Sequence, residues 1–169
     1  MNLRKLTVAG MLVALSVILS TFSIPIGASR CFPIQHMVNV IAAVFLGPLY
    51  GVSMAFCTSL IRNMIGTGSL LAFPGSMAGA FICGLVFYYT HRVSLTCFGE
   101  IIGTGIIGGM LAYPIASLMM GQEAALFTFV VPFLMSTTVG TIIASVIIGA
   151  LYKTKAYQVI EQVLKEENH

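Results

Sequence analysis

The chain has 169 residues, of which 58% are hydrophobic and only 8% are charged, and its formal net charge is +3. Its mean hydropathy is +1.01. A soluble globular domain carries charge at about a quarter of its positions to cover its surface, so this composition excludes that class. Lipid accepts apolar side chains and rejects unpaired polar groups. We therefore expect an all-α integral membrane protein, with residues 1–152 forming a single transmembrane domain.

Six apolar runs punctuated by proline and glycine predict six transmembrane helices, at residues 6–24, 37–47, 49–61, 71–90, 98–120 and 125–152. The second and third runs are each shorter than the roughly 20 residues that a spanning helix needs, and they could together form one span. Gly47, Pro48 and Gly51 between them favour a turn instead, because proline removes a backbone donor and glycine relaxes the backbone.

The loop charges distinguish six spans from five. With six spans, six of the eight basic residues lie in cytoplasmic segments and only Arg30 and Arg62 lie outside; with five spans, three lie inside and five outside. Lysine and arginine collect in cytoplasmic loops, so six spans are favoured. This topology predicts a multi-pass protein of the cell membrane with both termini in the cytoplasm. The two short helices must then be tilted within the bundle or sheltered by it.

The last segment, residues 153–169, forms the cytoplasmic amphipathic tail. Tyr157, Ile160 and Leu164 share one helical face, with charged residues elsewhere. Such a helix suits a membrane surface or a partner protein. A solvated tail that frays is an equally open alternative.

The motifs of enzymes and pumps are missing from the sequence. His36, His91 and His169 have no metal-ligand spacing, and no GxxxxGK[ST] loop is present to bind nucleotide phosphates. Any work driven by ATP must therefore be done by another polypeptide. We expect no catalytic site, no metal, no cofactor and no nucleic-acid partner. Glu100 is the one carboxylate within reach of a helix, and we interpret it as an interfacial residue at the inner end of the fifth helix.

The outer segments favour binding of a small, largely uncharged molecule, because hydrogen-bonding side chains gather there beside aromatic ones. The polar residues are Arg30, Gln35, His36, Asn39, Arg62, Asn63, Thr67 and Ser69, and the aromatic ones are Phe32, Phe73, Tyr113 and Phe127. The alternative is that the aromatic residues form an interfacial belt and that Arg62 reaches out to lipid headgroups.

Small residues recur at a spacing of four in two predicted helices. Gly10 and Ala14 lie in the first, where they offer a groove for a partner helix, and Gly105 and Gly109 lie in the fifth. For the fifth helix, packing within the bundle is the simpler interpretation.

Two blocks of sequence resemble a known family. They are Cys31-Phe32-Pro33-Ile34-Gln35-His36-Met37-Val38-Asn39, running on to Leu46-Gly47-Pro48, and Arg62-Asn63 followed by Gly66-Thr67-Gly68-Ser69-Leu70-Leu71-Ala72-Phe73-Pro74-Gly75-Ser76. They are similar to the S components of energy-coupling factor transporters, and among those to the thiazole-specific ThiW family. The blocks cover roughly residues 31–85.

The resemblance implies a six-helix substrate-binding subunit that captures a thiamin precursor, hydroxyethylthiazole, outside the cell. Its partners would be a transmembrane coupling protein, met by small residues of the first helix, and two ABC-type ATPases. Gly10 stands where the family motif has its first alanine. An S component for another vitamin or precursor, and a structural subunit without a ligand, remain as alternatives.

For such a ligand, position and side-chain type suggest individual roles. We assign Phe73 and His36 to stacking, Asn63 and Gln35 to hydrogen bonds, and Arg62 to ordering the outer loop. The expected substrate site comprises Gln35, His36, Asn39, Arg62, Asn63, Thr67, Phe73 and Tyr113.

Overall fold

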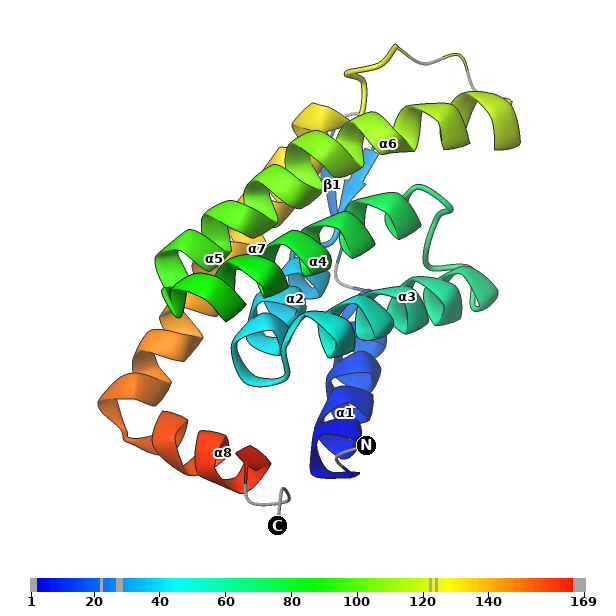
Figure 1. Ribbon diagram of the computed structural model, residues 1–169. Helices are drawn as coiled ribbons and strands as arrows, with labels where there is room; N and C mark the ends of the chain where they lie inside the picture. Colours follow the sequence, from blue (N-terminus) through cyan, green and yellow to red (C-terminus); the bar gives the residue numbers. More distant parts are fainter. Residues whose placement is uncertain (1–2, 22, 27–28, 122, 124, 166–169) are drawn as a thin grey trace.

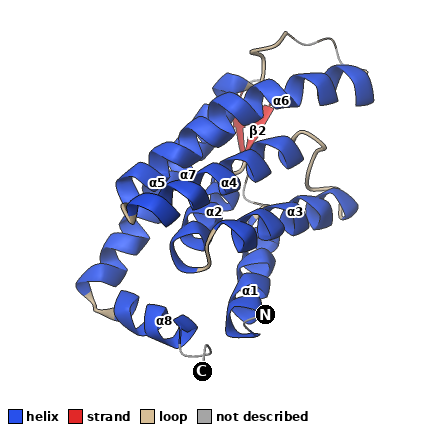
Figure 2. Cartoon of the chain, in the orientation of Figure 1, coloured by secondary structure: helices blue, strands red, loops and turns tan. Residues whose placement is uncertain are grey.

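The computed structural model describes residues 3–21, 23–26, 29–121, 123 and 125–165, which form a helical bundle with one short hairpin (Figures 1 and 2). The helices are α1 (Leu3–Leu19), α2 (Pro33–Phe45), α3 (Pro48–Met64), α4 (Ala72–Thr90), a continuous helix over Val93–Met119, α7 (Val130–Lys153) and α8 (Ala156–Lys165). The Val93–Met119 helix, which we call the fifth helix, contains α5 (Val93–Glu100), the π-helix η1 (Ile101–Gly108), α6 (Gly109–Pro114) and the π-helix η2 (Ile115–Met119).

Each of the six apolar runs corresponds to a helix, and α8 adds a seventh within the tail. Among the described residues, three helices are long and apolar enough to cross a membrane: α4, the fifth helix and α7. The expected helical class is confirmed, whereas the number of spans stays a prediction. The sequence did not predict the antiparallel hairpin of β1 (Ile24–Ile26) and β2 (Ser29–Cys31), in which Pro25 pairs with Arg30.

Proline and glycine set the helix boundaries near the centre of the bundle. Pro33 and Pro48 are the first residues of α2 and α3, where the missing N–H would have no intrahelical partner. Gly47 precedes Pro48 with φ of 93°, a conformation that glycine adopts without strain. The predicted turn between the second and third runs is therefore confirmed.

The short helix α2 lies at the centre of the bundle. It has 13 residues, ten of which are buried, and it packs against α1, α3, α4, α5 and α7. At 1.5 Å per residue it is about 20 Å long, too short to span the hydrocarbon core by itself. Because its neighbours cover it on nearly all sides, it meets the expectation of a helix sheltered by the bundle.

Glycines allow the fifth helix to approach its neighbours closely. A Cβ atom added at Gly103 would lie 2.8 Å from Cα of Gly79 on α4, closer than real Cβ contacts. A Cβ atom at Gly109 would lie 2.9 Å from Cα of Val130 on α7, and one at Gly105 would collide with Leu134. The predicted Gly105/Gly109 pair thus serves packing within the bundle.

The helix α8 folds back on the bundle beside α1 (Figure 1). Tyr157 stacks on Tyr152 at a ring-centroid distance of 4.2 Å and lies 5.2 Å from Phe45, while Leu164 is buried. Arg4 Nη1 donates a hydrogen bond to Val163 O at 2.8 Å. The chain itself therefore covers the apolar face that we expected to meet a membrane surface or a partner. Residues 166–169 of the predicted tail lie outside the described residues.

We predict that Gly103→Ala destabilises the bundle by about 1–3 kcal/mol, because the new methyl group meets the backbone of α4 and cannot escape by rotation. Gly149→Ala on α7 is the matched control, since a Cβ atom there meets nothing within 4 Å. Thermal unfolding of both variants in detergent measures the difference. Equal melting temperatures would show that the two helices are not in close contact at Gly103.

Candidate substrate pocket

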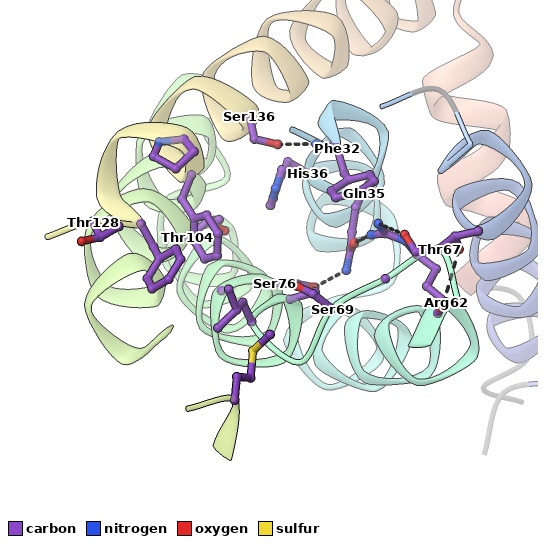
Figure 3. Close-up of a pocket in the computed structure, with 18 of the residues that line it drawn as sticks. Phe32, Gln35, His36, Arg62, Thr67, Ser69, Ser76, Thr104, Thr128 and Ser136 are labelled. Atoms are coloured by element: carbon purple, nitrogen blue, oxygen red, sulfur yellow. Dashed lines mark hydrogen bonds between the residues drawn. The ribbon is translucent and has the colours of Figure 1, made fainter. Parts of the chain in front are cut away.

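A cavity of about 680 Å³ lies among the helices of the bundle (Figure 3). The N-terminal ends of α2, α4 and α7, the C-terminal end of α3 and the fifth helix surround it. Its lining residues are Phe32, Gln35, His36, Arg62, Gly66, Thr67, Gly68, Ser69, Leu71, Ala72, Gly75, Ser76, Thr104, Met120, Glu123, Thr128, Phe129, Pro132, Phe133 and Ser136.

Gln35 connects three helices beside the cavity. Its Oε1 accepts a short hydrogen bond from Arg62 Nη1 on α3, and its Nε2 donates to Ser59 Oγ at 3.1 Å and to Ser76 Oγ at 2.7 Å (Figure 3). Gln35 and Arg62 are 4% and 1% exposed. Buried polar groups without partners are costly, so this amide fixes α2, α3 and α4 relative to one another.

Arg62 also holds the connection between α3 and α4. Its guanidinium lies 3.9 Å from the centroid of the Phe32 ring, and its Nη2 donates to Thr67 O at 3.3 Å. The backbone N–H groups of Thr67 and Gly68 donate to Arg62 O, and Asn63 Nδ2 donates to Ser59 O and Ser69 O. Arg62 is therefore buried and internally bonded, and the alternative in which it reaches lipid headgroups is wrong.

Glu100 is not interfacial, in contrast to our expectation from the sequence. It is 0% exposed, and its Oε1 lies 3.0 Å from His36 Nδ1, 3.0 Å from Asn39 Nδ2 and 2.9 Å from Thr104 Oγ1. His36 and Thr104 line the cavity, so Glu100 lies directly behind its wall. Sequence position placed Glu100 near a helix end, but α5 continues into η1 without a break and carries it into the interior.

The start of α7 and the β2 strand close one side of the cavity. Phe32 N donates to Ser136 Oγ at 2.8 Å, and Cys31 Sγ donates to Pro132 O at 3.2 Å. Burial raises the pKa of the Cys31 thiol, which keeps it protonated and unreactive. Phe129 and Phe133, with ring centroids 6.4 Å apart, add an aromatic wall.

The structure brings together half of the expected site: Gln35, His36, Arg62 and Thr67 line the cavity. Asn39 lies one layer deeper, bonded to Glu100 and to Ser76 O.

Asn63, Phe73 and Tyr113 are not among the lining residues. Phe73 packs instead on Phe56, with ring centroids 5.7 Å apart. On α1, Gly10 and Ala14 are exposed.

Several lining residues were not predicted from the sequence, among them Ser76, Thr104, Phe129, Phe133 and Ser136. Only Ser76 carried a signal, because it ends the second block that resembles the family. The others lie in long, predominantly apolar runs, where nothing local marks the face that meets the cavity. In the part of the chain that the structure describes, no group of three or more His, Cys, Asp or Glu side chains is placed to hold a metal ion.

We predict that Gln35→Met lowers the free energy of unfolding by about 2–3 kcal/mol, because it leaves Arg62, Ser59 and Ser76 without their shared partner. Gln158→Met is the matched control, since Gln158 is exposed on α8. Denaturation in detergent followed by circular dichroism measures both variants. A Gln35→Met protein as stable as its control would mean that the amide does not hold the three helices together.

A family described as thiamine-precursor transporter protein (ThiW) matches residues 6–154, which include every helix of the bundle except the start of α1 and the tail helix α8. No curated protein matches the chain. The family match extends far beyond the two blocks that carry the resemblance, and the apolar helices are those of a membrane protein. The chain thus belongs to the ThiW family of thiamine-precursor transporter proteins and is not an enzyme.

Proposed function

We propose that the chain is the substrate-capture subunit, or S component, of an energy-coupling factor importer. In this proposal it binds hydroxyethylthiazole at the outer face and delivers it inward with a coupling protein and two ABC-type ATPases. The observation that carries the proposal is the cavity of about 680 Å³ at one end of a bundle that belongs to a thiamine-precursor transporter family. Cavities of roughly 300–1,000 Å³ are typical of small-ligand sites.

The lining of the cavity suits a neutral heteroaromatic alcohol. Phe129 and Phe133 supply ring faces, and the hydroxyl groups of Ser76 and Ser136 can donate hydrogen bonds. The Thr104 hydroxyl donates to Glu100, so its oxygen can accept from a ligand. A thiazole needs a stacking surface, a donor for its ring nitrogen and a partner for its hydroxyl.

The two buried charges beside the cavity also favour a neutral ligand. Arg62 is engaged with Gln35, Thr67 and the ring of Phe32. Glu100 accepts hydrogen bonds from Asn39 and Thr104, and its Oε1 lies 3.0 Å from His36 Nδ1. Each charge already has partners, so a ligand bearing a full charge would gain less from either than from an unpaired counter-ion.

The proposed orientation places the cavity outside and both termini in the cytoplasm. Its support is the excess of lysine and arginine in the predicted inner segments, together with the position of the cavity at the helix ends that the six-span topology places outside, the N-terminal ends of α2, α4 and α7 and the C-terminal end of α3. The six-span topology belongs to the same proposal.

The proposed contact with the coupling protein uses the exposed face of α1. Gly10 and Ala14 lie on that face, and a Cβ atom at Gly10 would meet nothing within 4 Å. A partner helix could therefore approach the α1 backbone closely.

We predict that the purified chain binds hydroxyethylthiazole, and not the pyrimidine precursor or thiamin, in calorimetric titrations in detergent. Binding of the pyrimidine alone would replace the proposed substrate with another precursor. Binding of none of the three would favour the alternative of a structural subunit without a ligand.

We predict that a cysteine at Glu123, in a Cys57→Ala background, reacts with a membrane-impermeant thiol reagent on intact cells. Glu123 is exposed at the mouth of the cavity, and Cys57 is the one exposed native cysteine among the described residues. Lys153→Cys at the end of α7 is the control and should react only after the cells are broken. The reverse pattern would place the cavity on the cytoplasmic side.

A further inference from the structure

We propose that Glu100 is a positioning residue that holds His36 with its proton on Nδ1, so that Nε2 accepts a hydrogen bond from the hydroxyl group of the ligand. This inference rests on the proposed function, since it concerns the same cavity. It makes His36 the residue that selects an alcohol over an analogue without a hydroxyl group.

The hydrogen bonds around Glu100 fix the direction of the contact with His36. Oε1 of Glu100 accepts from Asn39 Nδ2, which is only a donor, and from Thr104 Oγ1. With two donors already directed at it, Oε1 acts as an acceptor. His36 Nδ1, at 3.0 Å, is then its third donor.

Burying Glu100 in this position costs free energy, and an apolar side chain would fill the same space without that cost. Ionisable side chains inside a membrane bundle are expensive and commonly mark a function. Glycine makes room for this one: a Cβ atom at Gly79 would lie 2.7 Å from Glu100 Oε2 and would collide with Thr104 Oγ1. The helix also changes to the π form directly after Glu100, an irregularity that is frequent at functional sites.

The ring of His36 is held with its other nitrogen free for a ligand. Its contact with Glu100 is the one hydrogen bond that the ring makes to the described residues. The backbone behind it is fixed by close packing on α7, where a Cβ atom at Gly140 would lie 2.8 Å from His36 Cβ. His36 lines the cavity (Figure 3), so Nε2 is the atom through which it would recognise a donor.

The chemical class of the ligand follows from the free nitrogen. A lone pair on Nε2 attracts an O–H or N–H group and gains nothing from an ether, an alkyl group or a carboxylate. The hydroxyethyl arm of the proposed substrate provides such a donor.

The tautomer is tested by nitrogen-15 NMR of the chain in detergent, labelled at its three histidines, with a His36→Asn sample to assign the His36 signals. We expect the neutral ring of His36 to carry its proton on Nδ1. Glu100→Gln should shift the population toward the Nε2-protonated form, because an amide holds the Nδ1 proton less strongly than a carboxylate and can itself donate. Glu161→Gln, on α8, is the matched control and should leave the signal unchanged.

The hydroxyl contact is tested by calorimetry with hydroxyethylthiazole and its analogue bearing an ethyl group. We expect the native chain to prefer the alcohol by about five- to tenfold, the effect of one hydrogen bond. His36→Asn keeps a donor for Glu100 but removes Nε2, so this variant should bind the alcohol and the ethyl analogue about equally. His91→Asn, at the other end of α4, should retain it. Glu100→Gln should reduce the preference, which provides a second variant if His36→Asn does not fold.

The outcomes separate this inference from the proposed function. A proton on Nε2 in the native chain, or on both nitrogens, overturns the inference, as does equal binding of the alcohol and the ethyl analogue. In those cases binding of the thiazole ring still supports the proposed function. Failure of the native chain to bind either compound instead defeats the proposed function itself.

Discussion

One turn of α2 bonds to two ionisable side chains of opposite type, Arg62 and Glu100, that are buried in an apolar bundle, and the positions of the surrounding helices depend on it. Gln35 accepts from Arg62 on α3, whereas His36 and Asn39 bond to Glu100 on the fifth helix. In lipid neither charge could exist without partners, because removing either one from water costs several kcal/mol. The central helix is short and sheltered for the same reason: its polar residues must meet other helices rather than lipid.

Close packing makes this arrangement possible. Gly79 leaves space for Glu100 and Thr104 on one side, and Gly140 lets α7 reach the backbone of α2 on the other. A larger residue at either position would separate the helices and lengthen the buried hydrogen bonds, which weaken steeply with distance and misalignment. Glycines in this chain therefore make room for the buried polar side chains and also allow the helices to pack closely.

The same network defines the cavity above it. Arg62 anchors the α3–α4 connection through Thr67 and stacks under Phe32, so part of the rim is ordered before any ligand enters. His36 and Thr104 join the rim to Glu100 below. A preformed site of this kind loses less conformational entropy on binding than one that must first be assembled.

The sequence by itself determined the membrane class, the positions of the six apolar helices and the turn at Gly47-Pro48, because composition, run length and proline chemistry are local properties. It also singled out Gln35, His36, Arg62 and Thr67, four of the expected site residues, and these line the cavity.

Only the tertiary structure decided the depth of Glu100, the aromatic wall of Phe129 and Phe133, and the separation of Asn63 and Phe73 from the cavity. Which face of an apolar helix meets a cavity depends on the rotation of that helix against its neighbours. In a run that is apolar on all sides, no periodic pattern records that rotation. The structure sets it through glycine contacts between helices that are distant in the sequence.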